Sequence, residues 1–171
     1  MFVRVELLLY FGGVMEGSTM DDKWIREMAE GIRRDVQAKK LKDEKFVETQ
    51  KLKRQLGPSL WSDLKQHLNE ACGGINKEMA SEVALFRDLS GAEVSVTGQG
   101  EGMYTTMTVK FSADRSLLEY ESQQGNPMGK FEVAIGSGGH ANFTSRDFPI
   151  GQSAEDVARE IMRHALRVSP H

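Results

Sequence analysis

The stretch that decides the fold is residues 103–122, Met-Tyr-Thr-Thr-Met-Thr-Val-Lys-Phe-Ser-Ala-Asp-Arg-Ser-Leu-Leu-Glu-Tyr-Glu-Ser. Alternate residues from Met103 to Phe111 are apolar or small, whereas those between them are largely polar. Leu118 and Tyr120 alternate with glutamates in the same way. A period of two is typical of a strand with one face buried and the other in water. The short turn at 113–115 leaves no room for a crossover, so the two strands are predicted to be antiparallel.

The same alternation extends outward on both sides of this stretch. It predicts further short strands at Val83–Phe86, Glu93–Val96, Phe131–Ile135 and Ala141–Ser145. The segments between them, Gly98–Gly102, Gln124–Pro127 and Gly136–Gly139, are rich in turn-forming residues. The sequence therefore predicts an antiparallel meander of four to six strands.

Helical periodicity precedes the predicted sheet. Apolar residues recur every three or four positions from Trp24 to Val36, and the pattern weakens at 39–43 before it resumes at Phe46. Whether residues 21–56 form one bent helix or two is left open. Gly57-Pro58 is predicted to end this segment, because proline interrupts helical hydrogen bonding. A second helix is then predicted from an N-cap at Ser59, ending at Gly73-Gly74 or continuing to about Met79.

A last helix follows the predicted strands. Ser153 and Asp156 approximate a capping box, and an apolar stripe runs from Val157 to Val168. Because the predicted sheet has one apolar and one polar face, the helices are expected on the apolar face alone. The predicted fold class is α+β: N-terminal helices, an antiparallel β-meander of four to six strands, and a C-terminal amphipathic helix packed on one sheet face.

Composition is that of an ordinary globular protein. The chain has 171 residues, of which 39% are hydrophobic and 27% charged, and a net charge of −3. We expect a basic helical arm at residues 20–56 and an α+β body at residues 57–171. The single Cys72 cannot form an intramolecular disulfide, which favours a reducing, cytoplasmic location. The apolar run at residues 5–11 is far too short to cross a bilayer, so no membrane partner is expected.

The first nineteen residues allow two hypotheses. Met15-Glu16-Gly17 must be encoded ATG-GAR-GGN, which can read GGAGGG, a ribosome-binding sequence a short spacer before Met20. For a bacterial source we therefore expect translation to begin at Met20. The alternative is an edge strand with Val3, Val5 and Leu7 on one face.

No catalytic or metal-binding pattern emerges from the sequence. The four histidines (His67, His140, His164 and His171) show no motif spacing with one another or with Cys72, as a zinc site would require. The glutamates at 119, 121 and 132 alternate with apolar residues and are expected on a solvated sheet face. The glycine runs lie between strands rather than before a helix, which favours hairpin turns over a dinucleotide-binding motif. No cofactor is expected, and an enzyme is the less favoured class.

Charge is unevenly distributed along the chain. Between Arg33 and Arg54 there are nine basic and four acidic residues, a net of +5, whereas residues 55–171 carry ten basic and fifteen acidic residues, a net of −5. The favoured interpretation is pairing of the arm with an acidic body, its own or that of a second copy. The alternative is contact with nucleic-acid phosphates. The candidate phosphate contacts are Arg33, Arg34, Lys39, Lys40, Lys51, Lys53 and Arg54.

These patterns favour a non-enzymatic binding or assembly module that self-associates through its N-terminal helices. An amphipathic helix in so charged a segment needs a partner to persist, and a second copy is the economical one. The candidate interface residues are Trp24, Ile25, Met28, Ile32 and Val36. A further alternative is a carrier of small apolar ligands, with Met103, Met107 and Met162 lining a cavity between sheet and C-terminal helix.

Overall fold

The computed structural model describes residues 22–100, 102–123 and 127–168. The chain divides into two compact units, residues 1–44 and residues 45–171, so the division falls within the segment assigned to the basic arm. The predicted start at Met20 and the alternative strand at Val3–Leu7 both lie outside the described residues. Among the residues described, no helix is long and apolar enough to span a membrane.

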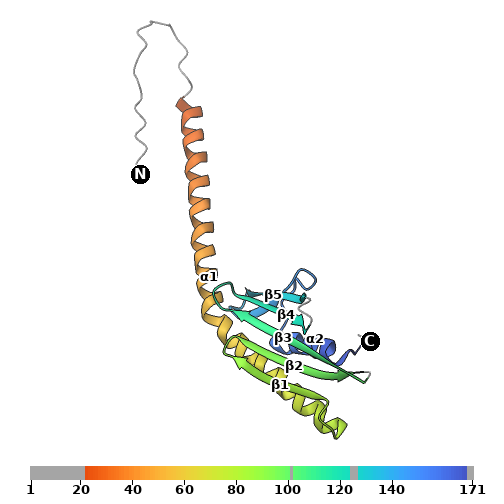
Figure 1. Ribbon diagram of the computed structural model, residues 1–171. Helices are drawn as coiled ribbons and strands as arrows, with labels where there is room; N and C mark the ends of the chain where they lie inside the picture. Colours follow the sequence, from red (N-terminus) through yellow and green to blue (C-terminus); the bar gives the residue numbers. More distant parts are fainter. Residues whose placement is uncertain (1–21, 101, 124–126, 169–171) are drawn as a thin grey trace. The chain divides into compact units, whose positions relative to one another are not determined.

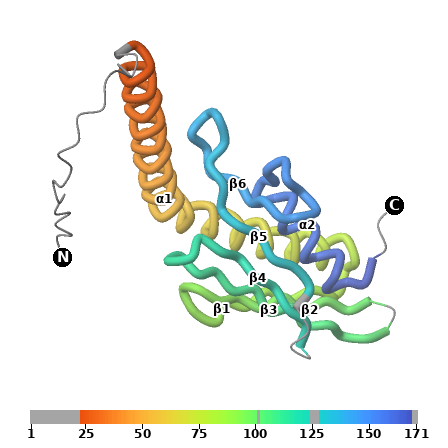
Figure 2. The backbone as a smooth tube through the Cα atoms, turned by 90° about the horizontal axis from the view of Figure 1, so that it is seen from above, coloured from red at the N-terminus to blue at the C-terminus, as the bar shows by residue number. Residues whose placement is uncertain are grey.

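The elements follow the predicted order of helix, strands and helix (Figure 1). Helix α1 comprises Asp22–Met79 and α2 comprises Ala154–Leu166. The strands are β1 (Ala84–Ser90), β2 (Glu93–Gly100), β3 (Met103–Ser112), β4 (Leu117–Ser122), β5 (Pro127–Ile135) and β6 (Ala141–Thr144). Each strand pairs with the next one along the chain in antiparallel orientation, so the predicted α+β meander is confirmed. Figure 2 follows the backbone through the strands to α2.

Helix α1 is continuous through Pro58, so the predicted break at Gly57-Pro58 is wrong. An interior proline removes a backbone hydrogen bond and costs about 3 kcal/mol. Packing on both sides of the proline offsets this cost. Gly57 is buried, and a Cβ added there would lie 3.1 Å from the Phe111 ring. Trp61 is also buried, stacks on Phe111 at 5.7 Å, and donates its indole hydrogen to the Gly91 carbonyl at 2.7 Å.

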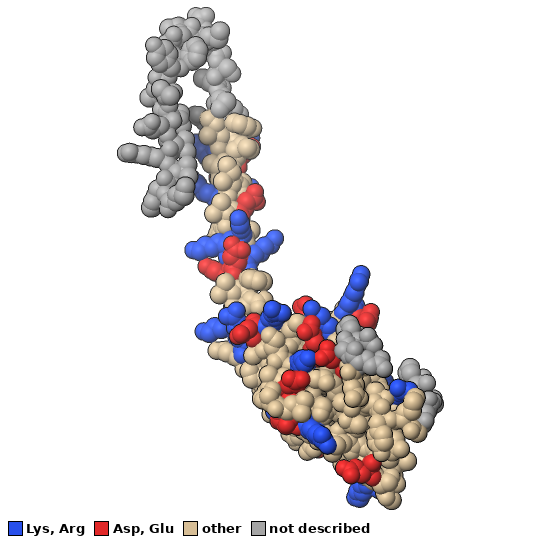
Figure 3. All heavy atoms as spheres, viewed as in Figure 1, with Lys and Arg blue, Asp and Glu red and all other residues tan. Residues whose placement is uncertain are grey.

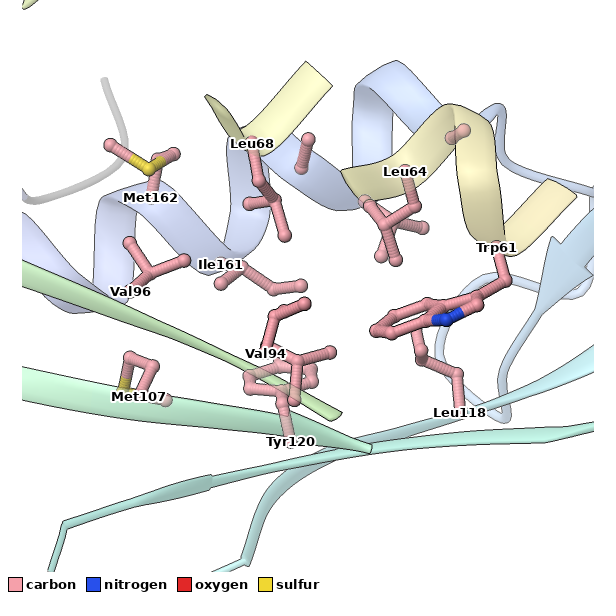
Figure 4. Close-up of a cluster of buried hydrophobic side chains, with 14 of the residues drawn as sticks. Trp61, Leu64, Leu68, Val94, Val96, Met107, Leu118, Tyr120, Ile161 and Met162 are labelled. Atoms are coloured by element: carbon pink, nitrogen blue, oxygen red, sulfur yellow. The ribbon is translucent and has the colours of Figure 1, made fainter. Parts of the chain in front are cut away.

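The core of the 45–171 unit lies between one sheet face and two helices, which are α2 and the part of α1 that belongs to this unit. Figure 4 shows Leu64 and Leu68 of α1 beside Ile161 and Met162 of α2, above inward-pointing side chains of β2–β4. Leu64, Leu68 and Ile161 are fully buried. The facing strand residues include Val94, Val96, Met107, Val109, Leu118 and Tyr120. The expectation that the C-terminal helix packs on the apolar sheet face is thus confirmed.

The end of α1 is tied to the first strand by a side chain. The Asn76 amide nitrogen donates to the Ala84 carbonyl at 2.7 Å, and the Asn76 amide oxygen accepts from the backbone of Val83 and Ala84 at 2.9 and 2.8 Å. Asn76 thereby occupies the edge of β1 as a neighbouring strand would. Gly73 and Gly74 lie within α1 rather than ending it.

Two glycines of β2 create the space in which α2 lies. A Cβ at Gly98 would stand 2.7 Å from the Ala165 backbone, and one at Gly100 would stand 1.9 Å from the Leu166 carbonyl oxygen. The interpretation of Gly98–Gly102 as turn residues was therefore wrong for Gly98 and Gly100. They belong to the strand because only a residue without a side chain allows the helix so close.

The N-terminus of α2 is capped as predicted. The Ser153 side chain accepts from the Asp156 backbone at 3.1 Å, and the Asp156 carboxylate accepts from the Ser153 backbone at 3.2 Å. The hydrogen bond from the Ser153 hydroxyl holds the pKa of Asp156 below its ordinary value. The apolar stripe is shorter than expected, because α2 ends at Leu166 and Val168 is half exposed.

We predict that Gly100→Ala lowers the free energy of unfolding by about 3 kcal/mol, because the new methyl group overlaps the α2 backbone. Gly73→Ala is the matched control: its Cβ meets nothing within 4 Å, and it should raise stability by about 1 kcal/mol through helix propensity. Urea denaturation measures both. Equal stability of Gly100→Ala and wild type would show that the sheet and α2 are not in this contact.

Candidate functional site

The exposed apolar stripe of α1 is the first candidate site. It consists of the five predicted interface residues Trp24, Ile25, Met28, Ile32 and Val36, whose exposed fractions are 51, 45, 51, 59 and 62%. All five lie in the first unit and in α1. At about 3.6 residues per turn, Ile25, Met28, Ile32 and Val36 fall on one side of the helix, with Trp24 at its margin. The structure thus brings the predicted interface residues to a common, accessible surface.

The predicted phosphate contacts are accessible but mixed with acids. All seven are exposed except Lys53, which is half-buried. On the face shown in Figure 3, cationic and acidic side chains alternate along α1. Lys40 lies 4.0 Å from Glu44, and the Arg34 side chain donates to the Glu30 carbonyl within the helix. A mixed surface attracts a polyanion less than a cluster of cations does.

The three predicted cavity methionines occupy different surroundings. Met107 and Met162 are buried in the core, with exposed fractions of 1 and 5%, and Figure 4 shows them on either side of Val96. Met103, at the start of β3, is 51% exposed. The Cys72 thiol contacts the Met162 sulfur at 3.9 Å. Burial raises the pKa of Cys72 to about 11, so this thiol is protonated at neutral pH and is no nucleophile.

The outer face of the sheet carries the predicted solvated charges in pairs. Lys110 of β3 contacts Glu121 of β4 at 2.5 Å, and Glu119 of β4 lies 3.5 Å from Lys130 of β5. The hydrogen bond with Glu121 and its negative charge raise the pKa of Lys110. These four residues border a shallow hollow of about 520 Å³. Because each carboxylate there faces an ammonium group, neither is prepared for acid–base catalysis.

A polar cluster between the sheet and α2 was not predicted from the sequence. The Tyr120 hydroxyl donates to the Glu160 carboxylate at 2.5 Å, and the Tyr120 ring lies 5.8 Å from the His164 ring. Gly129 leaves room for this tyrosine, since a Cβ there would stand 2.2 Å from the ring. Burial, followed by the hydrogen bond and charge of Glu160, raises the pKa of Tyr120. Glu160 and His164 are one helical turn apart, a spacing that the sequence does contain.

This cluster joins β4 to α2 through a hydrogen bond and is not a reactive centre. A tyrosine whose pKa is raised remains a neutral hydrogen-bond donor, so it supplies no phenolate nucleophile at neutral pH. The other histidines lie apart: His140 is exposed and His67 faces Glu70 at 3.9 Å, while His171 is outside the described residues. In the part of the chain that the structure describes, no three His, Cys, Asp or Glu side chains are placed to hold a metal ion.

Comparison with protein-family models, with curated protein sequences and with solved structures finds no match. Because a fold by itself does not define a function, the function is inferred below from the residues of this chain.

We predict that Tyr120 ionises only when the chain unfolds. Because its pKa is raised in the folded state, the folded chain holds the proton more tightly than the unfolded chain, whose tyrosine titrates near 10. The stabilisation is present below about pH 10 and is lost as the pH rises further. In a Tyr10→Phe, Tyr104→Phe background, tyrosinate absorbance should appear together with the loss of circular dichroism.

Glu160→Gln tests the cause of this behaviour. It removes the negative charge while keeping an acceptor, so the midpoint of Tyr120 ionisation should fall. A tyrosine that titrates near pH 10 in a chain with unchanged circular dichroism would contradict the buried hydrogen bond.

Proposed function

We propose that this chain is a homotypic assembly module in which the apolar stripes of two α1 helices pair in antiparallel orientation. The observation that carries the proposal is the exposure of five large apolar side chains on one short helical segment. Helix propensity alone stabilises a helical segment little in water, and burial of its apolar side chains against a partner stabilises it further. Helical pairing through i, i+3, i+4 and i+7 positions is the mode that such a stripe supports.

The order of acidic and basic residues around the stripe favours a second copy of the chain as the partner. Residues 21–32 carry four acidic and two basic residues, a net of −2, and residues 33–44 carry five basic and three acidic residues, a net of +2. Antiparallel pairing sets the negative half of each segment against the positive half of the other. Parallel pairing sets like against like, which is unfavourable.

The position of the charges agrees with a two-fold axis at the centre of the stripe. In the sequence, Asp21-Asp22 precedes the stripe and Lys39-Lys40 follows it. The midpoint between these two pairs nearly coincides with residue 30, the midpoint of Trp24 and Val36. An isologous interface requires this self-complementary arrangement.

The pairing is expected to be weak. Burying the remaining exposed surface of each stripe residue contributes about 1 kcal/mol per side chain, and the loss of free motion on association opposes it. We therefore expect a dissociation constant of about 10–100 µM. Such an affinity makes assembly dependent on protein concentration, or on tethering to a further binding event.

Light scattering at increasing protein concentration tests the proposal. The variant Ile25→Asp, Met28→Asp, Ile32→Asp should convert dimers into folded monomers, because three charges enter the interface. The control Gln37→Lys, Ala38→Lys, Leu41→Lys also adds three charges, on the opposite face of the helix and of the sign that residues 33–44 already carry, and it should remain dimeric.

A monomeric wild type at about 1 mM, well above the expected dissociation constant, would overturn the proposal. If added nucleic acid then shifted the particle mass, the cationic residues would be the functional ones.

Engineered cysteines test the orientation. In an antiparallel pair centred near residue 30, two copies of Val36→Cys stand about 18 Å apart, too far for a disulfide. Mixing Val36→Cys with Trp24→Cys should instead give a crosslinked heterodimer under mild oxidation. Efficient crosslinking of Val36→Cys with itself would show a parallel pair.

A further inference from the structure

A groove in the 45–171 unit runs between α1 and the edge of β6 that faces away from β5. Two adjoining hollows, of about 250 and 390 Å³, share Leu60 and Asp63 of α1 and Ala141 of β6. The second hollow continues to Ser153 and Glu155 at the start of α2. The groove therefore has a helix on one side and a strand edge on the other.

The edge of β6 presents backbone hydrogen-bonding groups to this groove. Phe143 directs its N–H and C=O away from β5, because both bond to Gln152, at 2.9 and 2.6 Å. Residues along a strand alternate, so Ala141 directs its N–H and C=O to the same edge. The neighbouring His140 carbonyl points the other way and accepts from Gly136. Neither group of Ala141 has a partner among the described residues.

Gln152 shows that this edge accepts an antiparallel strand. It forms an isolated bridge with Phe143, and the chain then turns away into α2. Beyond that single bridge, the position at Ala141 is open. Exposed strand edges of this kind bind extended peptides through the main chain, while side chains on alternate residues supply specificity.

The walls of the groove define the side chains that fit. The Ala141 side chain packs against the core, on the same sheet face as Phe143. A peptide residue paired with Ala141 points to that face too, toward the apolar Leu60. Asp63 is exposed and has no hydrogen bond or ion pair within the described part of the chain. None of the described residues that line either hollow is Lys or Arg.

We propose that this groove binds an extended segment of a partner protein, hydrogen-bonded to β6 at Ala141 and carrying Lys or Arg opposite Asp63. The paired residue is apolar or β-branched, and the cationic residue stands two positions away, since alternate residues of a strand share a face. The site is separate from the α1 stripe, so peptide binding requires no dimer.

A random heptapeptide library displayed on phage is the first probe. Panning against the full chain should enrich sequences with Val, Ile or Thr two positions from Lys or Arg. The consensus peptide is then synthesised with a fluorescent label and its affinity measured by anisotropy. Absence of enrichment above an unrelated protein would overturn the proposal.

Two variants and one control locate the binding site. Ala141→Pro removes the edge N–H without removing a bond to β5, and should weaken binding about tenfold. Asp63→Lys should weaken it about tenfold or more through charge repulsion. The control Asp114→Lys, in the turn between β3 and β4, should bind as wild type. Circular dichroism confirms that each variant is folded.

A modified peptide tests the same hydrogen bonds by a change in the peptide instead of the protein. Methylation of the backbone nitrogen at the residue that pairs with Ala141 should abolish binding even if Ala141→Pro fails to fold. The stripe variant Ile25→Asp, Met28→Asp, Ile32→Asp should bind the peptide unchanged. Retained binding by Asp63→Lys and by the methylated peptide, or loss confined to the stripe variant, would place the peptide elsewhere and overturn the proposal.

Discussion

The structure depends on the burial of a single apolar sheet face. An antiparallel meander with alternating residues has one face that water does not stabilise, and two helices of the 45–171 unit cover it. Fully buried side chains such as Leu64, Val94 and Ile161 contribute about 1.5–3 kcal/mol each. The free energy of this burial exceeds the cost of the interior proline in α1. It also holds α2 close to Gly98 and Gly100 of β2.

The remaining surfaces differ in how many of their polar, charged and apolar groups have partners within the protein. The outer sheet face pairs lysines with glutamates across neighbouring strands, and Thr97 and Thr106 share a hydrogen bond at 2.9 Å. Such exposed pairs stabilise the fold little, but these charged and polar groups already have partners and do not need a ligand to supply them. The α1 stripe and the β6 edge are different, because apolar side chains and backbone groups there have no partners among the residues that the structure describes.

The candidate sites were predictable to different degrees. The α1 stripe follows from three- and four-residue spacing alone, since every member lies on one helix. The Tyr120 cluster and the groove do not, because each joins residues that are distant in the chain. Glu160 and His164 are one turn apart, but no local signal indicates that Tyr120 of β4 will stand beneath them. Likewise, the turn-rich segment before Ala141 gives no sign of facing Asp63 on α1.

The sequence by itself determined the α+β class, the strand order, the helical stripe of residues 24–36 and the capping box at Ser153. Each of these follows from a local period or a local hydrogen bond, which neighbouring residues specify. Only the tertiary structure decided that α1 continues past Pro58 and that Gly98 and Gly100 belong to a strand. Local preference favoured a helix break at Pro58, by about 3 kcal/mol, and a turn at the glycines. Core packing against Phe111 and the α2 backbone outweighed those preferences, because it acts through contacts far apart in the chain.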